Sequence, residues 1–122
     1  MKENLLIDKS ISFAVRIIKL YQYLIKTKKE SIISKQIIRS GTSIGANINE
    51  ANYGQSKKDF ISKMHIALKE TAETEYWIKL LNKTDLIDDK LCKEKHCFLH
   101  CGICRGGDLF FGSARQGVSG LF

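Results

Sequence analysis

The absence of proline is the feature that most constrains the fold of this 122-residue chain. Proline kinks or ends helices, so a chain without it suits long helices and argues against a β-sandwich with prolines in its turns. Apolar residues recur at spacings of three and four, and no segment alternates convincingly between apolar and polar residues. The length allows one domain, or one domain plus a tail, and excludes a TIM barrel or two nucleotide-binding halves. The sequence therefore predicts an all-α domain.

Three long helices and a shorter fourth are predicted from this spacing. Their expected ranges are residues 8–28, 31–52, 57–82 and 89–100. Asp8 or Ser10 is expected to cap the first helix, and Ser56 the third, because their side-chain oxygens can accept from free backbone N–H groups. Ser56 and Asp59 approximate a capping box, with Asp in place of the usual Glu. Asp88 is expected to cap the fourth helix.

Each predicted helix has an expected buried face. In the first helix this face contains Ile11, Ala14 or Val15, Ile18, Leu20 or Tyr21, and Ile25. In the second it contains Ile33, Ile37, Ile38, Ile44 and Ile48. In the third it contains Phe60, Met64, Ala67, Leu68, Thr71, Ile78 and Leu81, and in the fourth Leu91 and Phe98. Helices of this length with short connections favour an antiparallel up-down four-helix bundle.

Two glycines lie inside the second predicted helix, where each costs about 1 kcal/mol relative to alanine. Gly41 and Gly45 are one turn apart, which indicates the close approach of another backbone. The alternative is that the helix bends or breaks near Gly41. A third glycine, Gly54, is expected to serve as the C-cap of this helix.

The composition changes abruptly near residue 95, and this change divides the chain into a helical domain (1–100) and an atypical tail (101–122). All four cysteines lie between Cys92 and Cys104, the last lysine is Lys95, and six of the nine glycines lie in residues 102–122. Three alternatives are open: a native Gly-rich tail, a small cysteine-based metal site, or a shifted reading frame or foreign sequence. The fourth helix is the weakest of the predicted elements, because the helical pattern disappears beyond Gly102.

Cysteine and histidine side chains between Cys92 and Cys104 could in principle hold a zinc ion. These are Cys92, His96, Cys97, His100, Cys101 and Cys104. A second Cys-x-x-Cys pair at a suitable spacing is missing, so the prediction is that the chain holds no metal and no cofactor.

Polar residues interrupt the apolar pattern of the second and third helices. Ser43, Asn47 and Glu50 share one stripe of the second helix, and Glu73 and Glu75 lie within the third. One interpretation is a hydrogen-bonded network that fixes helix register and assembly. The other is a catalytic carboxylate pair of Glu50 with Glu73 or Glu75. The first is favoured, because no Glu-x-x-His pair of the kind found in di-metal bundles is present. No catalytic residue and no enzymatic activity are predicted.

The chain is basic, with 20 Lys and Arg residues against 13 Asp and Glu residues and a formal net charge of +7. Residues 1–91 contain 16 basic and 11 acidic residues, so the excess does not depend on the tail. Such residues can neutralise phosphates without reading sequence. The candidate nucleic-acid-binding residues are Lys35, Arg39, Lys57, Lys58 and Lys63. Few aromatic residues are close to them in sequence, which disfavours a base-stacking platform; the alternative is a merely solvated basic surface.

No stretch of the sequence has the length and apolarity of a signal peptide or of a membrane-spanning helix. We therefore expect a cytoplasmic protein with no membrane association.

Three motifs resemble the four-helix bundle proteins of the 23S ribosomal RNA intervening-sequence family. They are Gln36-Ile-Ile-Arg-Ser-Gly-Thr-Ser-Ile-Gly-Ala-Asn-Ile-Asn-Glu50, Lys58-Asp-Phe-Ile-Ser-Lys-Met-His-Ile-Ala-Leu-Lys-Glu70 and Thr71-Ala-Glu-Thr-Glu-Tyr-Trp77. The resemblance covers about residues 5–91, and the motif positions that it carries over are Arg39, Ser43, Asn47, Glu50 and Glu73. In the family the fourth helix continues as a long amphipathic segment, whereas here Leu91 is followed by cysteines and glycines. The resemblance therefore implies that the fourth helix is truncated or replaced by a Gly/Cys-rich tail.

The resemblance implies a small antiparallel four-helix bundle that assembles into a homopentamer and is not an enzyme. The related accessory variability determinant of diversity-generating retroelements is a basic pentamer that works with a reverse transcriptase and nucleic acid. The predicted function is thus a non-catalytic oligomeric protein that binds RNA or DNA backbone through a basic surface. The alternative is a structural or adaptor protein that binds a protein partner, for example a reverse transcriptase, without contacting nucleic acid.

Overall fold

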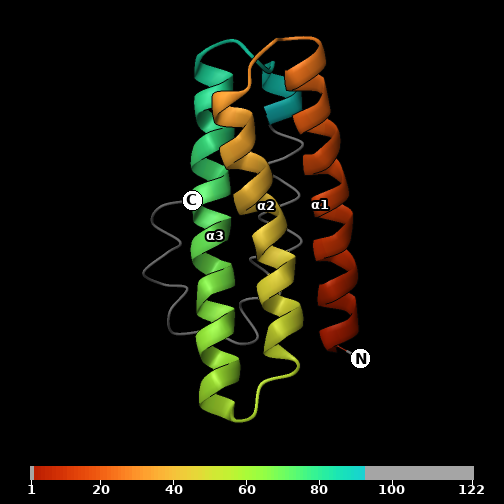
Figure 1. Cartoon of the computed structure of the whole chain (residues 1–122), viewed down its shortest axis with the longest axis vertical. Coiled ribbons are helices and arrows are strands. Elements are labelled where there is room, and N and C mark those ends of the chain that lie inside the picture. Colours follow the sequence, from red (N-terminus) through yellow and green to blue (C-terminus); the bar gives the residue numbers. More distant parts are fainter. Residues whose placement is uncertain (1, 93–122) are drawn as a thin grey trace.

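Three long helices form the framework of the protein. The structure is a computed structural model that describes the backbone of residues 2–92 and the side chains of residues 5–92. Helices α1 (Lys2–Lys26), α2 (Ile32–Ala51) and α3 (Lys57–Lys83) lie side by side, and short connections join them at opposite ends (Figure 1). A further helical turn covers residues 89–92, and the described residues contain no strand. The predicted all-α fold class is confirmed.

The predicted bounds of α2 and α3 are confirmed to within one residue, whereas the predicted start of α1 is wrong. Helix α1 begins at Lys2, before both of its expected caps. Residues 2–7 contain no helix breaker and several good helix formers, so the helix extends through Asp8. Ser10 is buried, and its hydroxyl donates to the carbonyl of Ile7 at 2.7 Å instead of capping the helix.

The predicted caps of α3 and of the fourth segment are confirmed. The Ser56 hydroxyl accepts from the backbone N–H of Asp59 at 3.1 Å, and the Asp88 carboxylate accepts from the backbone N–H of Leu91 at 2.7 Å. The capping box is only half formed, because the Asp59 carboxylate accepts from the backbone N–H of Gln55 rather than from that of Ser56.

The two ends of α2 differ from expectation. At its start the Glu30 carboxylate accepts from the backbone N–H groups of Ile32, Ile33 and Ser34 at 3.2, 2.8 and 2.9 Å, a cap that the sequence pattern did not identify. At its end Asn52 is the C-cap, so the predicted capping role of Gly54 is wrong. Gly54 does not adopt the left-handed conformation of a glycine cap. A Cβ atom there would lie 3.0 Å from the carbonyl oxygen of Ala51, so crowding accounts for the glycine.

Helix α1 packs closely against the two glycines inside α2. A Cβ atom at Gly41 would lie 2.8 Å from Cγ2 of Ile17, and one at Gly45 would lie 2.8 Å from Oγ of Ser10. The predicted close approach is therefore confirmed. The alternative of a break near Gly41 is wrong, because α2 continues unbroken to Ala51.

The buried faces of α2 and α3 are confirmed except at Leu68, which is half-buried and lies outside the core, and that of α1 is largely wrong. The side chains of α1 in the core are Leu6, Phe13, Ile17, Leu20 and Leu24. The predicted Ile11, Val15 and Ile18 are 56%, 44% and 39% exposed. Helix α1 has apolar residues on more than one side, so their spacing fits two possible buried faces. The contact with Gly41 and Gly45 of α2 buries the face that was not predicted. Leu20, which was predicted as an alternative to Tyr21 on the buried face, is buried.

The expected remainder of the fourth helix, the tail and the cysteine-based metal alternative lie outside the described residues. Of the four cysteines only Cys92 is described; its thiol is free, and burial raises its pKa. Within residues 2–92 no cluster of side chains could hold a metal ion. No helix of this part of the chain combines the length and apolarity needed to cross a membrane.

Candidate functional site

A band of polar side chains joins α2 to α3, and it contains two of the predicted motif residues. We define this α2–α3 polar seam by Arg39 and Ser40 of α2 with Glu70, Glu73, Thr74 and Trp77 of α3. The hydroxyls of Ser40 and Thr74 are hydrogen bonded at 2.9 Å, and both side chains are fully buried. This bond crosses the helix pair inside the core. Each hydroxyl also bonds a carbonyl of its own helix, Ser40 that of Ile37 at 3.4 Å and Thr74 that of Glu70 at 2.8 Å.

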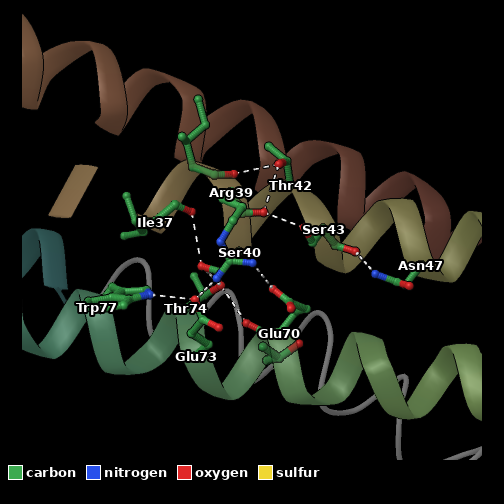
Figure 2. Close-up of polar contacts among 12 residues, drawn as sticks. Ile37, Arg39, Ser40, Thr42, Ser43, Asn47, Glu70, Glu73, Thr74 and Trp77 are labelled. Carbon is green, nitrogen blue, oxygen red and sulfur yellow. Dashed lines mark hydrogen bonds and ion pairs between the residues drawn. The ribbon is translucent and has the colours of Figure 1, made fainter. Parts of the chain in front are cut away.

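At the edge of the seam, Arg39 is held by acidic residues of α3 (Figure 2). Its guanidinium forms an ion pair with Glu73 and lies 3.4 Å from Oε2 of Glu70. The indole N–H of Trp77 also donates to Glu73, at 3.0 Å. This bond, with the charge of Arg39, lowers the pKa of Glu73, while the Glu73 carboxylate raises the pKa of Arg39. Arg39 thus faces two carboxylates, and its charge is offset.

Ser43 and Asn47 share a stripe of α2 as predicted, but their hydrogen bonds stay within that helix. The Ser43 hydroxyl donates to the carbonyl of Arg39 at 2.6 Å, and the Asn47 amide donates to the carbonyl of Ser43 at 2.8 Å (Figure 2). Glu50 does reach α3, where it accepts from Nζ of Lys63 at 2.9 Å. The expected network across the helices is therefore made largely by other residues.

Three residues of the seam, Ser40, Glu70 and Thr74, were not predicted from the sequence. Ser40 and Thr74 could have been found, because each is a small polar residue within the apolar stripe of its helix. Their pairing could not, because it depends on how far α2 is shifted along α3.

The carboxylate pair weighed as a catalytic interpretation does not form. Glu50 lies eleven residues beyond Arg39 on α2, about 16 Å along the helix axis, whereas Glu73 contacts Arg39 directly. Glu75 is buried and forms an ion pair with Lys79 at 3.1 Å. The three carboxylates therefore lie in separate surroundings, and neither proposed pair can share a proton or a metal ion.

The five candidate nucleic-acid-binding residues fall into two groups. Arg39 and Lys63 are held in ion pairs with acidic residues of the opposite helix. Lys35, Lys57 and Lys58 are exposed and form no ion pair with another described residue. Lys35 lies near the start of α2, whereas Lys57 and Lys58 follow the opposite end of α2, about 24 Å away along its axis. These residues do not form one continuous patch.

The fold and the polar seam define a small helical-bundle protein whose described residues show no assembled catalytic or metal-binding group. A family model described as "23S rRNA-intervening sequence protein" matches residues 2–96, and the chain belongs to this family. The predicted family is confirmed, and the match ends close to the change in composition.

The fold is also similar to a crystal structure from Bacteroides thetaiotaomicron VPI-5482, described as a protein with unknown function from the S23 ribosomal protein family. The two sequences are 48% identical, the TM-score is 0.86, and the similarity covers 89% of this chain and 97% of the other. No curated protein matches the chain.

Proposed function

We propose that this protein is a non-catalytic, oligomeric four-helix bundle that binds RNA or DNA backbone through exposed lysines. The observation that carries this proposal is the division of its basic residues into paired and unpaired ones. Arg39, Lys63 and Lys79 are held by carboxylates, whereas Lys35, Lys57 and Lys58 are exposed and unpaired among the described residues. The unpaired lysines are the ones whose charge is available to phosphate.

Binding of this kind depends steeply on salt and little on sequence. Each phosphate neutralised by a lysine releases condensed counterions, and the affinity falls as the salt concentration rises. A lysine ammonium that contacts phosphate carries no information about the base, so unrelated sequences are expected to bind with similar affinity.

A filter-binding series with labelled RNA and DNA of unrelated sequences, from low to physiological salt, tests this proposal. The expected result is binding at low salt that weakens as salt increases and is similar for all sequences. Lys35→Glu, Lys57→Glu and Lys58→Glu together should weaken binding strongly, whereas Lys63→Gln with Glu50→Gln, which removes an ion-paired lysine and its partner, should have a small effect. Absence of binding at low salt would overturn the proposal.

An exposed apolar stripe on α1 supports the proposed oligomer. Ile11, Val15 and Ile18 project from one side of α1 and remain exposed within the protomer. The helical turn at residues 89–92 packs elsewhere, since Leu91 lines a groove with Leu20 and other residues of α1. Leu20 lies about 200° around the helix from Ile18. We therefore assign the stripe to a contact with a second copy in an assembly of antiparallel up-down bundles, a homopentamer by family resemblance.

Sedimentation of the purified protein tests the oligomer. The wild-type protein should sediment as a defined oligomer, and Ile11→Lys with Ile18→Lys should yield a monomer of unchanged helix content. A wild-type monomer at micromolar concentration would contradict this part of the proposal.

The second candidate function is an adaptor for a protein partner, for example a reverse transcriptase, and the α1 stripe also favours it. An adaptor of this kind would still capture its partner after Lys35, Lys57 and Lys58 are changed to Glu, and would lose it after Ile11→Lys with Ile18→Lys. A reverse transcriptase from the same genomic neighbourhood is the partner to use. Either function places the protein in the cytoplasm, which we include in the proposal.

A further inference from the structure

Three lysines and one tyrosine lie along a single line on α3. Helix α3 is unbroken from Lys57 to Lys83. Lys58, Lys69, Tyr76 and Lys83 follow one another at intervals of eleven, seven and seven residues, and each interval is within about 20° of a whole number of turns. We call these four residues the α3 lysine face. It extends about 38 Å along the helix, since it spans 25 residue steps of about 1.5 Å.

The lysines of the α3 lysine face are exposed and are not held in ion pairs within the described residues. Glu73 lies next to this face, about 60° around the helix from Tyr76. Its carboxylate is already held by Arg39 and Trp77. The polar seam thereby draws the nearest acidic group away from the lysines.

The tyrosine in this line is exposed and oriented. Tyr76 is 57% exposed, and its ring packs edge-on against Trp77 with the centroids 5.2 Å apart and the planes at 70°. Trp77 is fixed in turn by its hydrogen bond to Glu73. One face of α3 therefore presents an accessible aromatic ring between two lysines, each seven residues away.

We propose that the α3 lysine face binds a single-stranded nucleic acid. Its lysines contact phosphate groups along the strand, and Tyr76 stacks against one base. This inference rests on the proposed function and specifies both the surface and the form of the nucleic acid. A single strand fits better than a duplex, because the bases of a duplex are stacked on each other and cannot reach an aromatic side chain on a helix surface.

This arrangement also explains why the sequence disfavoured a stacking surface. That interpretation considered only aromatic residues close in sequence to the candidate lysines, whereas Tyr76 is two helical turns from both Lys69 and Lys83. Only a continuous α3 brings the three side chains to one face. Of the candidate residues predicted from sequence, the face includes Lys58 alone.

Fluorescence anisotropy with a short labelled single strand and with the corresponding duplex tests this inference. Tyr76→Leu should weaken single-strand binding about tenfold, because stacking of one base is lost, and should leave duplex binding unchanged. Tyr76→Phe keeps the ring and should bind like the wild type. Tyr23→Leu is the control, since Tyr23 is 39% exposed and lies on α1 rather than on α3.

Lysine variants test the phosphate contacts separately. Lys69→Gln and Lys83→Gln should each weaken single-strand binding at low salt, and Lys9→Gln, on an exposed position of α1, should not. These substitutions lie on the surface, so helix content and melting temperature should match the wild type.

The outcomes separate this inference from the function on which it rests. If the wild type binds and the Tyr76, Lys69 and Lys83 variants behave like the Tyr23 and Lys9 controls, the α3 lysine face is wrong while the proposed function stands. If Tyr76→Leu weakens duplex and single-strand binding equally, base stacking is overturned. If the wild type binds neither nucleic acid at low salt, both proposals are overturned.

Discussion

Replacing Gly41 by alanine is expected to destabilise the protein, although alanine is the better helix former. The added Cβ atom would lie 2.8 Å from Cγ2 and 2.9 Å from Cγ1 of Ile17. Ile17 is fully buried, and a β-branched side chain in a helix has one strongly preferred rotamer, so it cannot turn away. Overpacking of this kind costs about 1–3 kcal/mol. Alanine regains about 1 kcal/mol of helix propensity. The expected net loss is therefore up to about 2 kcal/mol.

Urea unfolding followed by circular dichroism measures this balance. Ala46→Gly, at an exposed position of α2, measures the difference in helix propensity between alanine and glycine without a change in packing. It should lower the free energy of unfolding by about 1 kcal/mol. In an Ile17→Ala background both γ-carbons are gone and only the Cβ atom of residue 17 remains, 3.3 Å from the added carbon, so Gly41→Ala should then stabilise the protein by up to about 1 kcal/mol. The sign of the Gly41→Ala effect is thus expected to reverse between the two backgrounds.

A different result would refute the packing of α1 on α2. If Gly41→Ala stabilises the otherwise wild-type protein by as much as Ala46→Gly destabilises it, nothing approaches Gly41, and the close contact with Ile17 is wrong.

Three further predictions follow from the helix ends and the polar seam. Glu30→Ala should lower the free energy of unfolding by about 1 kcal/mol, because three backbone N–H groups lose their acceptor, and an unchanged melting temperature would contradict this. Lys29 has a φ of 58°, so Lys29→Gly should stabilise by about 1 kcal/mol, and a loss of stability would show that the left-handed conformation is wrong. The ionised Glu73 carboxylate contributes to the stability of the folded state. This contribution is fully present above its unfolded-state pKa and is lost as the pH falls through its lowered folded-state pKa. Stability should therefore fall with pH below about 4.5, and less so in Glu73→Gln; equal slopes would refute the Trp77 and Arg39 contacts.

Much of the helical framework was predictable from the sequence because its signals are local. The caps at Ser56 and Asp88 each depend on a side chain and a backbone group three residues apart. The apolar stripes of α2 and α3 are flanked by polar residues, so their buried faces have one solution. Helix α1 has apolar residues on more than one side, and the face that it buries is decided by Gly41 and Gly45 of another helix.

The polar seam was less predictable because its contacts are long-range. Arg39 and Glu73 are 34 residues apart, and their ion pair depends on the axial shift between α2 and α3. Motif positions identified Arg39, Asn47 and Glu73 as special, but did not show that Asn47 bonds within its own helix. A count of basic residues likewise could not show which cations are already held by carboxylates.

In the proposed function, unpaired lysines neutralise phosphate and those held in ion pairs do not. The slope of log affinity against log salt concentration for a single-stranded oligonucleotide distinguishes the two kinds of lysine. Lys58 is unpaired, whereas Lys63, on the same helix, is held by Glu50. Lys58→Gln should reduce the magnitude of the slope by about 0.7, the value of one phosphate contact. Lys63→Gln with Glu50→Gln removes both charges of the ion pair and should leave the slope unchanged. Equal slopes for the wild type and Lys58→Gln, or an equal reduction in the Lys63 and Glu50 double variant, would contradict the account.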